Sequence, residues 1–141
     1  MPANKSFIDT NVLIYLLSAD SAKADRTEEI ILHGGIISVQ VLNELANVAL
    51  RKLGMLWPEI NDFLSLIRYV CPVEPLTVET HDCGRHVAER YKLGVYDSMI
   101  VAAALMAGCN TLYSEDMHDG LLIDDQVRVF NPFGPRSSQP Q

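Results

Sequence analysis

The chain has 141 residues, the length of one compact domain. Hydrophobic residues make up 48% of it and charged residues 21%, which excludes an intrinsically disordered, collagen-like or disulfide-scaffold chain. The 11 Lys and Arg against 18 Asp and Glu give a formal net charge of −7. Such a chain does not hold nucleic acid through its overall charge. Either its partner is not a polyanion, or the negative charge is concentrated where function needs it.

In the first half of the chain, short apolar runs alternate with stretches of helical period. The pattern predicts a strand over 6–8, a helix over 12–17, a helix over 25–33, a strand over 36–39 and a helix from about 41 to 53. Gly34 and Gly35 end the second helix, as glycine after a last helical turn commonly does. Val41, Leu45 and Val48 recur at the spacing of a buried helical stripe.

The second half continues the same alternation. It predicts a helix with Pro58 in its first turn, a short strand or extended link over 70–75, a helix from Thr77 to Lys92, an alanine-rich helix over 97–107, and strands over 111–114 and 127–130. The last eleven residues hold three of the seven prolines, so we expect one domain over 1–130 and a flexible tail over 131–141. Strands that alternate with helices predict an α/β fold whose parallel sheet is covered on both faces.

The cysteines and the hydropathy indicate the compartment. Three cysteines without a CxxC pair suit reduced thiols in a cytosolic protein. The cluster of His81, Cys83 and His86 lacks the second ligand pair that a structural zinc site needs. No window approaches about 18 uninterrupted apolar residues, and no cleavable leader is recognisable. We therefore expect a cytoplasmic protein without a membrane segment.

Four carboxylates flank the predicted core elements. Asp9 directly follows the first strand, and Glu44 lies one turn into the helix after the second strand. Asp97 opens the alanine-rich helix, and Asp116 follows the strand over 111–114. The carboxyl ends of parallel strands meet at one edge of a sheet, so we expect the four to converge there. Hard oxygen ligands without paired His or Cys suit Mg²⁺ or Mn²⁺.

Each acid also has an ordinary structural interpretation when it is taken alone. Asp9 suits an Asx-turn or a helix cap, and Asp97 suits a helix N-cap. Glu44 suits a solvated helix face, and Asp116 suits a turn. Four acids on one rim nevertheless repel one another unless something positive lies between them, and this favours the functional interpretation of the set.

At this point the chain resembles a known family, the PIN-domain nucleases, and is most similar to the VapC-type toxins of bacterial toxin–antitoxin pairs. The resemblance spans about 7–131 and rests on four segments: FIDTNVLI at 7–14, VLNE at 41–44, YDSMIVAAA at 96–104 and LYSED at 112–116. It implies a three-layer α/β/α sandwich with a central, mostly parallel sheet. It also implies a metal-dependent endoribonuclease that hydrolyses RNA phosphodiester bonds, forms a homodimer and is held inactive by an antitoxin.

The resemblance assigns roles to particular residues. The catalytic and metal-binding acids are Asp9, Glu44, Asp97 and Asp116, with Mg²⁺ or Mn²⁺ as the cofactor. Ser114 matches the Thr or Ser that is frequent in the family, and Thr10 and Asn11 are expected to orient Asp9 or a bound water. Many members carry a further acid two residues after the fourth aspartate. His118 stands there in this chain, so Asp119 is the candidate for a fifth ligand.

Substrate and partner surfaces are less sharply defined by the sequence. The candidate RNA-binding cations are Arg51, Lys52, Arg85, Arg90 and Lys92, and Tyr15, Trp57 and Tyr96 are candidates for stacking on bases. The solvated faces of amphipathic helices explain the cations equally well, and burial in the core explains most aromatics better. The apolar residues Ile60, Phe63, Leu64 and Ile67 fit either a dimer surface or the core.

Three other classes compete with a ribonuclease. A haloacid-dehalogenase-like phosphatase needs a second aspartate two residues after the first, where this chain has Asn11. A Rossmann nucleotide-binding module needs a glycine-rich loop after the first strand, and that loop has no glycine. A PIN-fold module that binds RNA or protein without cutting is disfavoured because the acidic quartet is complete. The quartet also accounts for four of the seven excess negative charges.

Overall fold

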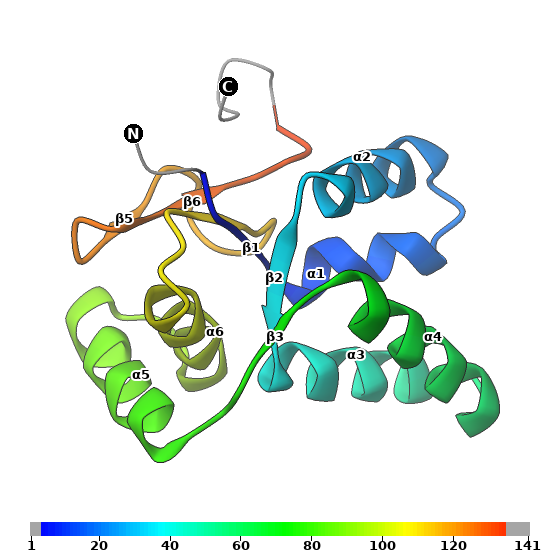
Figure 1. Ribbon diagram of the computed structural model, residues 1–141, viewed down its shortest axis with the longest axis horizontal. Coiled ribbons are helices and arrows are strands. Elements are labelled where there is room, and N and C mark those ends of the chain that lie inside the picture. The colour runs from blue at the N-terminus through cyan, green and yellow to red at the C-terminus, as the bar shows by residue number, and fades with distance from the viewer. Residues whose placement is uncertain (1–3, 135–141) are drawn as a thin grey trace.

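The computed structural model describes residues 4–134. Its elements in chain order are β1 (Ser6–Ile8), α1 (Thr10–Leu13), the 3₁₀ helix η1 (Ile14–Leu17), α2 (Ser21–Leu32), β2 (Gly35–Ser38), α3 (Val39–Arg51), α4 (Trp57–Val70), β3 (Val73–Glu74), α5 (Val78–Tyr91), α6 (Val95–Met106), β4 (Thr111–Tyr113), β5 (Leu122–Ile123) and β6 (Val127–Phe130). Figure 1 shows the helices grouped around the central strands.

The strands form one six-stranded sheet in the order β3-β2-β1-β4-β6-β5. Every pairing is parallel except that of β5 with β6. The chain builds outward from β1 through β2 to β3 on one side, and then returns to add β4 and β6 on the other side of β1. The direction of winding therefore reverses between β1 and β4, and this is where open α/β sheets bind ligands.

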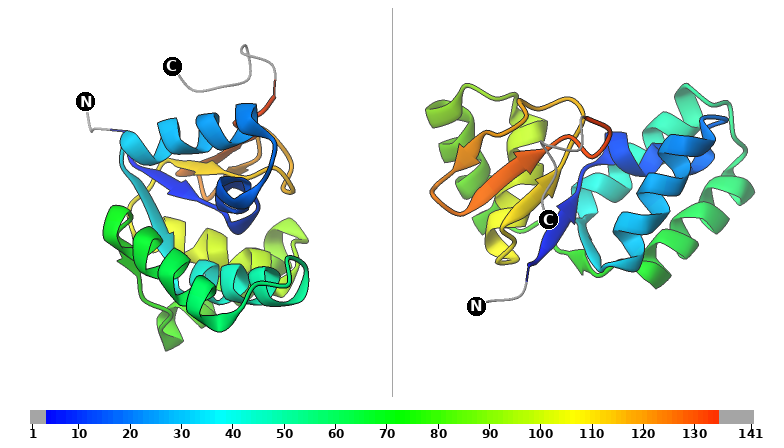
Figure 2. Two further views of the ribbon diagram at one scale, coloured as in Figure 1. Left: turned by 90° about the vertical axis from the view of Figure 1, so that its right-hand side faces the viewer. Right: turned by 90° about the horizontal axis from the view of Figure 1, so that it is seen from above.

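Helices cover both faces of the sheet. Figure 2, left, shows α2 on one face and α3, α4, α5 and α6 on the other. This three-layer α/β/α arrangement around a mostly parallel sheet confirms the predicted fold class.

The core lies between the sheet and the helices on both of its faces, and α6 contributes the longest buried run. Phe7 and Ile8 of β1 and Leu112 of β4 are fully buried. In α6, the run from Ile100 to Ala104 is buried almost without interruption, which explains why its sequence shows no polar face. Small alanine side chains bring this helix close to the strands, as the sequence predicts.

Several element boundaries differ from the sequence prediction because polar side chains cap the helices early. The first helix begins at Thr10 and not at Val12, since Asp9 caps it. The second begins at Ser21, four residues before its predicted start, because Asp20 accepts a hydrogen bond from the Lys23 amide at 3.1 Å. The sequence pattern missed β5, a two-residue edge strand with one exposed side chain.

Helix α4 and the segment after β6 are both the subject of predictions from the sequence. In α4, Ile60, Phe63 and Ile67 are buried in the core, so this set does not form a dimer surface. Beyond β6, residues Asn131 to Gly134 of the predicted tail continue along the domain, and the ring of Phe133 packs edge-on against Tyr15 at 4.9 Å between centroids. Residues 135–141 of that tail lie outside the described residues.

The described part of the chain contains no helix that is both long and apolar enough to cross a membrane. Its three cysteines, Cys71, Cys83 and Cys109, are unpaired, in keeping with the expectation of reduced thiols.

The contact between β1 and β2 predicts an effect of adding one methyl group. A Cβ placed on Gly35 would overlap Cδ1 of the fully buried Ile8 and would lie 2.8 Å from its Cγ1. We expect Gly35→Ala to lower the free energy of unfolding by about 1–3 kcal/mol, measured by chemical denaturation. Ile8→Val removes the clashing methyl, so the double variant should lose less stability than the two single losses added together. Strict additivity would contradict this account.

Candidate acidic site at the end of the sheet

The site is built around Asp9, which emerges from β1 at the point where the sheet reverses its direction of winding. The Asp9 amide donates to the carbonyl of Tyr113 at 3.0 Å and so extends the pairing of β1 with β4 by one step. The same residue caps α1 and is only 2% exposed. The end of a buried strand therefore places a carboxylate inside the protein rather than on its surface.

The Asp9 carboxylate accepts three hydrogen bonds. Oδ1 accepts from the Thr10 amide at 2.7 Å. Oδ2 accepts from Oγ of Ser114 at 2.8 Å and from Nδ2 of Asn11 at 3.0 Å. Ser114 directly follows β4, so residues from two neighbouring strand ends hold the carboxylate in one orientation.

Burial raises the pKa of Asp9 from 3.8 to about 7. The hydrogen bonds from Ser114 and Thr10 work in the opposite direction, and the nearby charges of Asp97 and Glu44 raise the pKa further. Near neutral pH a substantial fraction of the Asp9 carboxyl groups is therefore protonated. A positive charge beside it would favour the ionised form.

The other three predicted acids lie around Asp9. In α3, Oε1 of Glu44 accepts from Oγ1 of Thr10 at 2.8 Å, which ties this helix to the end of β1. Asp97 lies in the first turn of α6, where burial and then the charges of Glu44 and Asp116 raise its pKa. The structure thus brings all four predicted carboxylates together at one edge of the sheet, as the sequence analysis expects.

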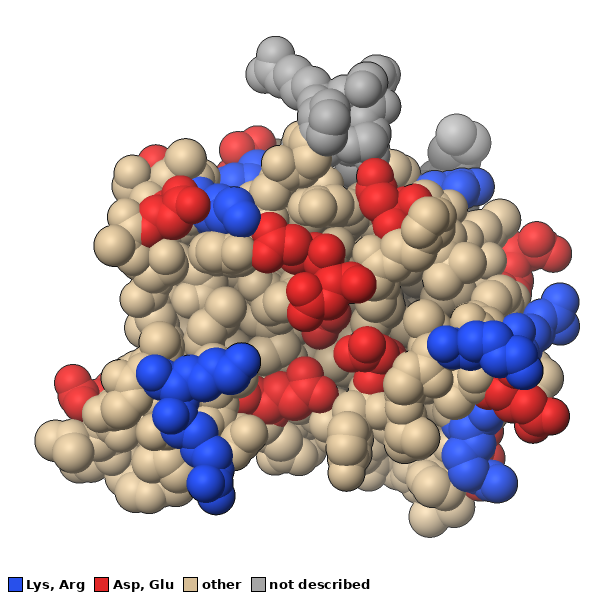
Figure 3. All heavy atoms as spheres, turned by 180° about the vertical axis from the view of Figure 1, so that it is seen from behind, with Lys and Arg blue, Asp and Glu red and all other residues tan. Residues whose placement is uncertain are grey.

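An open groove of about 660 Å³ passes over this edge. It is lined by Thr10, Asn11, Ile14, Gln40, Asn43, Glu44, Asn47, Val48, Lys52, Leu53, Tyr96 and Asp116. Figure 3 shows acidic side chains gathered in the hollow at the middle of this face, with Lys and Arg on both sides of them.

The remaining predicted site residues lie at different distances from the groove. Among the predicted cations, Lys52 lines it, whereas Arg85 is exposed on α5 and pairs with Asp82 at 3.1 Å. Arg51, Arg90 and Lys92 are also exposed, and they do not line the groove. Asp119 does not join the acids, because its Oδ1 accepts from the Asn131 amide at 2.9 Å. Asp119 thus fixes the segment that follows β6.

The donor set suits a hydrated cation better than a caged one. Within residues 4–134, no three His, Cys, Asp or Glu side chains stand close enough together to hold a metal ion by themselves. His81, Cys83 and His86 do not form such a group. Mg²⁺ keeps several waters and takes one or two carboxylates, so a groove lined by Glu44 and Asp116, with Asp97 close to both, fits it.

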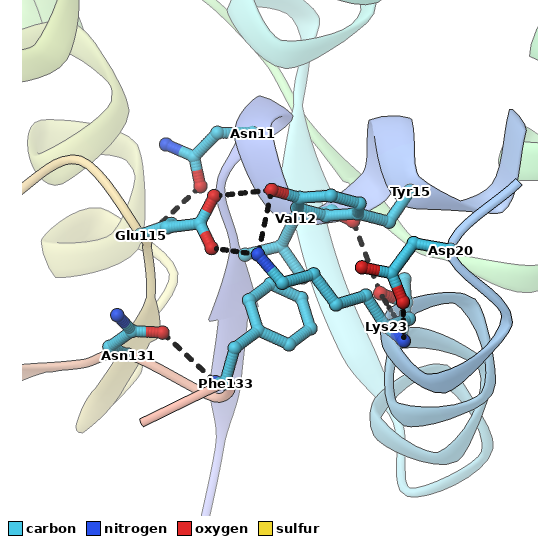
Figure 4. Close-up of polar contacts among 9 residues, drawn as sticks. Asn11, Val12, Tyr15, Asp20, Lys23, Glu115, Asn131 and Phe133 are labelled. Carbon is cyan, nitrogen blue, oxygen red and sulfur yellow. Dashed lines mark hydrogen bonds and ion pairs between the residues drawn. The ribbon is translucent and has the colours of Figure 1, made fainter. Parts of the chain in front are cut away.

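Sequence reasoning missed a polar cluster next to the site. Glu115, between Ser114 and Asp116, accepts from the hydroxyl of Tyr15 at 2.6 Å and from Nζ of Lys23 at 2.8 Å. Figure 4 shows Lys23 reaching from α2 across the rings of Tyr15 and Phe133 to this carboxylate. Burial by itself would raise the pKa of Glu115, but the hydrogen bonds from Lys23 and Tyr15 outweigh burial and lower the pKa.

Asn11 connects this cluster to the buried acid. Its Nδ2 donates to Asp9, and its Oδ1 accepts from the Glu115 amide at 2.9 Å (Figure 4). The segment after β4, which carries Ser114 and Asp116, is therefore attached to η1, α2 and the site at once. No spacing in the sequence signals such a cluster, because Tyr15, Lys23 and Glu115 come from three separate segments.

Comparisons with known proteins agree with this geometry. The family model described as "PIN domain" matches residues 6–118. The fold and the acidic site define a PIN-type α/β domain, and the chain belongs to the PIN domain family. No curated protein sequence matches it.

Solved structures share the fold at low sequence identity. A toxin–antitoxin complex from Klebsiella pneumoniae superposes with a TM-score of 0.69 at 17% identity, over 92% of this chain and 98% of that one. The sarcin–ricin-loop-cleaving toxin VapC20 of Mycobacterium tuberculosis gives 0.65 at 20% identity, over 79% and 90%. VapBC2 from Rickettsia felis, bound to a promoter DNA fragment, gives 0.65 at 15% identity, over 89% and 98%.

The raised pKa of Asp9 predicts the pH dependence of stability in metal-free protein. A carboxyl group whose pKa is higher in the folded state does not change the free energy of unfolding at low pH, where it is protonated in both states. It lowers that free energy as pH rises above 4, and it does so fully above pH 7, where it is ionised in both states. Relative to wild type, Asp9→Asn should therefore gain stability as pH rises from 4 to 8, by about 4 kcal/mol at most. Chemical denaturation in EDTA measures the difference. A difference independent of pH would contradict the burial of an ionisable Asp9.

The polar cluster predicts the effect of removing one hydroxyl. Tyr15→Phe keeps the ring against Phe133 and deletes the donor to Glu115, so it should lower the free energy of unfolding by about 1 kcal/mol. The matched control is Tyr69→Phe, since Tyr69 is 89% exposed and should tolerate the change. Equal effects of the two substitutions in urea denaturation would show that the Tyr15 hydroxyl does not stabilise the domain.

Proposed function

We propose that this protein is a divalent-metal-dependent endoribonuclease that hydrolyses RNA phosphodiester bonds, with Mg²⁺ or Mn²⁺ as its cofactor. The observation that carries the proposal is the convergence of Asp9, Glu44, Asp97 and Asp116 at the carboxyl edge of the sheet, with Asp9 buried and its pKa raised to about 7. Such an arrangement is unfavourable for folding alone, because like charges in a partly buried site repel one another. A bound cation would offset that repulsion.

The roles of the four acids follow from their burial and their partners. Asp9 and Asp97 are the two direct ligands we assign, since burial raises the pKa of both. Glu44 and Asp116 would hold the cation directly or through water, or position the attacking water. A bound Mg²⁺ or Mn²⁺ supplies charge neutralisation for the phosphodiester and lowers the pKa of water.

Neighbouring polar groups keep the acids in place. Ser114 and Asn11 donate to one oxygen of Asp9 and the Thr10 amide donates to the other, so this carboxylate cannot rotate freely. Thr10 also donates to Glu44, which fixes the distance between the end of β1 and α3. These residues orient the acids, and their own protons take no part in the cleavage that we propose.

RNA is the proposed substrate because Glu44 and Asp116 line an open groove rather than a closed pocket. A groove admits a polymer, whereas a small phosphomonoester calls for an enclosed site. Lys52 provides a positive charge in the groove for a phosphate. The VapC20 structure, described as a sarcin–ricin-loop-cleaving toxin, supports an RNA substrate for a protein of this fold.

We further propose that the protein is a cytoplasmic toxin with an antitoxin partner, and that it forms a homodimer. The structural neighbour from Klebsiella pneumoniae is described as a toxin–antitoxin complex, which supports the pairing. A shallow apolar depression between α2 and α4, lined by Ile31, Leu32, Leu66 and Val70, is the surface we assign to the protein partner. Leu32 is 85% exposed there, and covering it would stabilise a complex.

Cleavage by acidic-site variants tests the catalytic proposal. Asp9→Asn and Asp97→Ala should each reduce cleavage of total cellular RNA by about 100-fold or more in defined Mg²⁺ or Mn²⁺, whereas Asp62→Asn on the exposed face of α4 should cleave like wild type. Either metal should raise the melting temperature of wild type and of Asp62→Asn, but not that of Asp97→Ala.

The two readouts separate the alternatives. Full activity in Asp9→Asn would exclude the acidic site as the catalytic centre. Folded wild-type protein that is stabilised by neither metal and cleaves no RNA would indicate a PIN-fold module that binds without cutting.

A further inference from the structure

The groove that Glu44 and Asp116 line also runs along the rest of α3. Asn43 and Asn47 line it, and their spacing of four residues places both on the same face of the helix, one turn apart. Both are exposed, and neither amide forms a side-chain hydrogen bond within residues 4–134. Gln40, one turn before Glu44, differs from them because its Nε2 donates to that carboxylate at 3.0 Å. Asn43 and Asn47 therefore present free donors and acceptors to whatever occupies the groove.

An aromatic ring lines the same groove from another element. Tyr96 lies in the first turn of α6, directly before Asp97, and it is 70% exposed. Because the ring is exposed, packing in the core does not account for an aromatic residue at this position. Its flat face is available to another ring.

A positive charge stands further along the groove. Lys52 follows α3 directly, lines the groove and forms no ion pair within the described residues. The groove thus offers the carboxylates of Glu44 and Asp116, two free amides, an aromatic ring and a free cation. The acidic part suits a bound metal, and the rest suits the bases and backbone of a nucleic acid strand.

We propose that this part of the groove is a base-reading subsite that takes unpaired RNA nucleotides next to the cleaved bond. Tyr96 stacks on one base, Asn43 and Asn47 hydrogen-bond to base edges, and Lys52 binds a phosphate. Unpaired bases are required, because stacking on a side chain needs a base face that a duplex keeps covered. An amide can give one donor and one acceptor to the same base, which provides discrimination between bases. The inference rests on the proposed function and adds to it the residues that select the substrate.

Binding of short labelled RNAs tests the subsite without requiring cleavage. Fluorescence anisotropy is measured with Ca²⁺ in place of Mg²⁺, using single-stranded oligomers of A, C, G or U and an RNA duplex, and gels confirm that the RNA stays intact. Tyr96→Leu should weaken binding of all four single strands about tenfold, while Tyr96→Phe should bind like wild type. The double variant Asn43→Ala, Asn47→Ala should alter the order of preference among the four oligomers.

Matched controls come from α4, outside the groove. Tyr69→Leu and Asn61→Ala replace exposed residues of the same types and should leave binding unchanged. In cleavage assays Tyr96→Leu should raise KM and leave kcat unchanged, because the ring binds the substrate and takes no part in the cleavage step.

Three results would overturn the inference: wild type that binds no single-stranded RNA, wild type that binds the duplex as tightly as single strands, or unchanged binding in both the Tyr96→Leu and the double-asparagine variants. Failure of the catalytic proposal gives a different result. In that case Asp9→Asn cleaves normally, or nothing cleaves, while selective binding through Tyr96 persists.

Discussion

The structure depends on one unfavourable placement, a carboxylate buried where the sheet reverses its direction of winding. Asp9 lies there because strand β1, with Phe7 and Ile8 fully buried, ends one residue before it, and because its amide continues the pairing with β4. Three hydrogen bonds reduce the cost of burial, yet its pKa still rises to about 7. A fold that only had to be stable would place a neutral cap at this position, and the cation that we propose would offset the cost of the buried acid.

Much of the surrounding polar structure serves to keep this arrangement rigid. Asn11 joins Asp9 to the amide of Glu115, and Glu115 is held by Tyr15 and Lys23. The segment after β4 would otherwise be a loop free to move, and it carries two of the site residues. An ion pair between partly buried side chains, supported by an aromatic hydroxyl and two rings, holds that segment more firmly than a pair in open solvent would.

On the proposed function, an acidic site does not conflict with a nucleic acid substrate, because the acids would meet the reacting phosphate through a cation. The rest of the groove would contact the strand with two asparagine amides, an aromatic ring and one lysine. Affinity would then come from short-range contacts rather than from overall charge.

The sequence by itself determined the fold class, because β1, α6 and β4 show plain hydrophobic patterns. It also predicted the four acids, since Asp9, Asp97 and Asp116 stand in or next to these elements and Glu44 lies in the helix after β2. The early start of α2 and the edge strand β5 escaped it, since a cap and a two-residue strand carry little periodic signal. Only the tertiary structure decided that Asp119 serves the chain after β6, that Ile60 and Ile67 belong to the core, and that Tyr15, Lys23 and Glu115 meet. Those outcomes depend on contacts between segments far apart in the chain, and local pattern holds no information about such contacts.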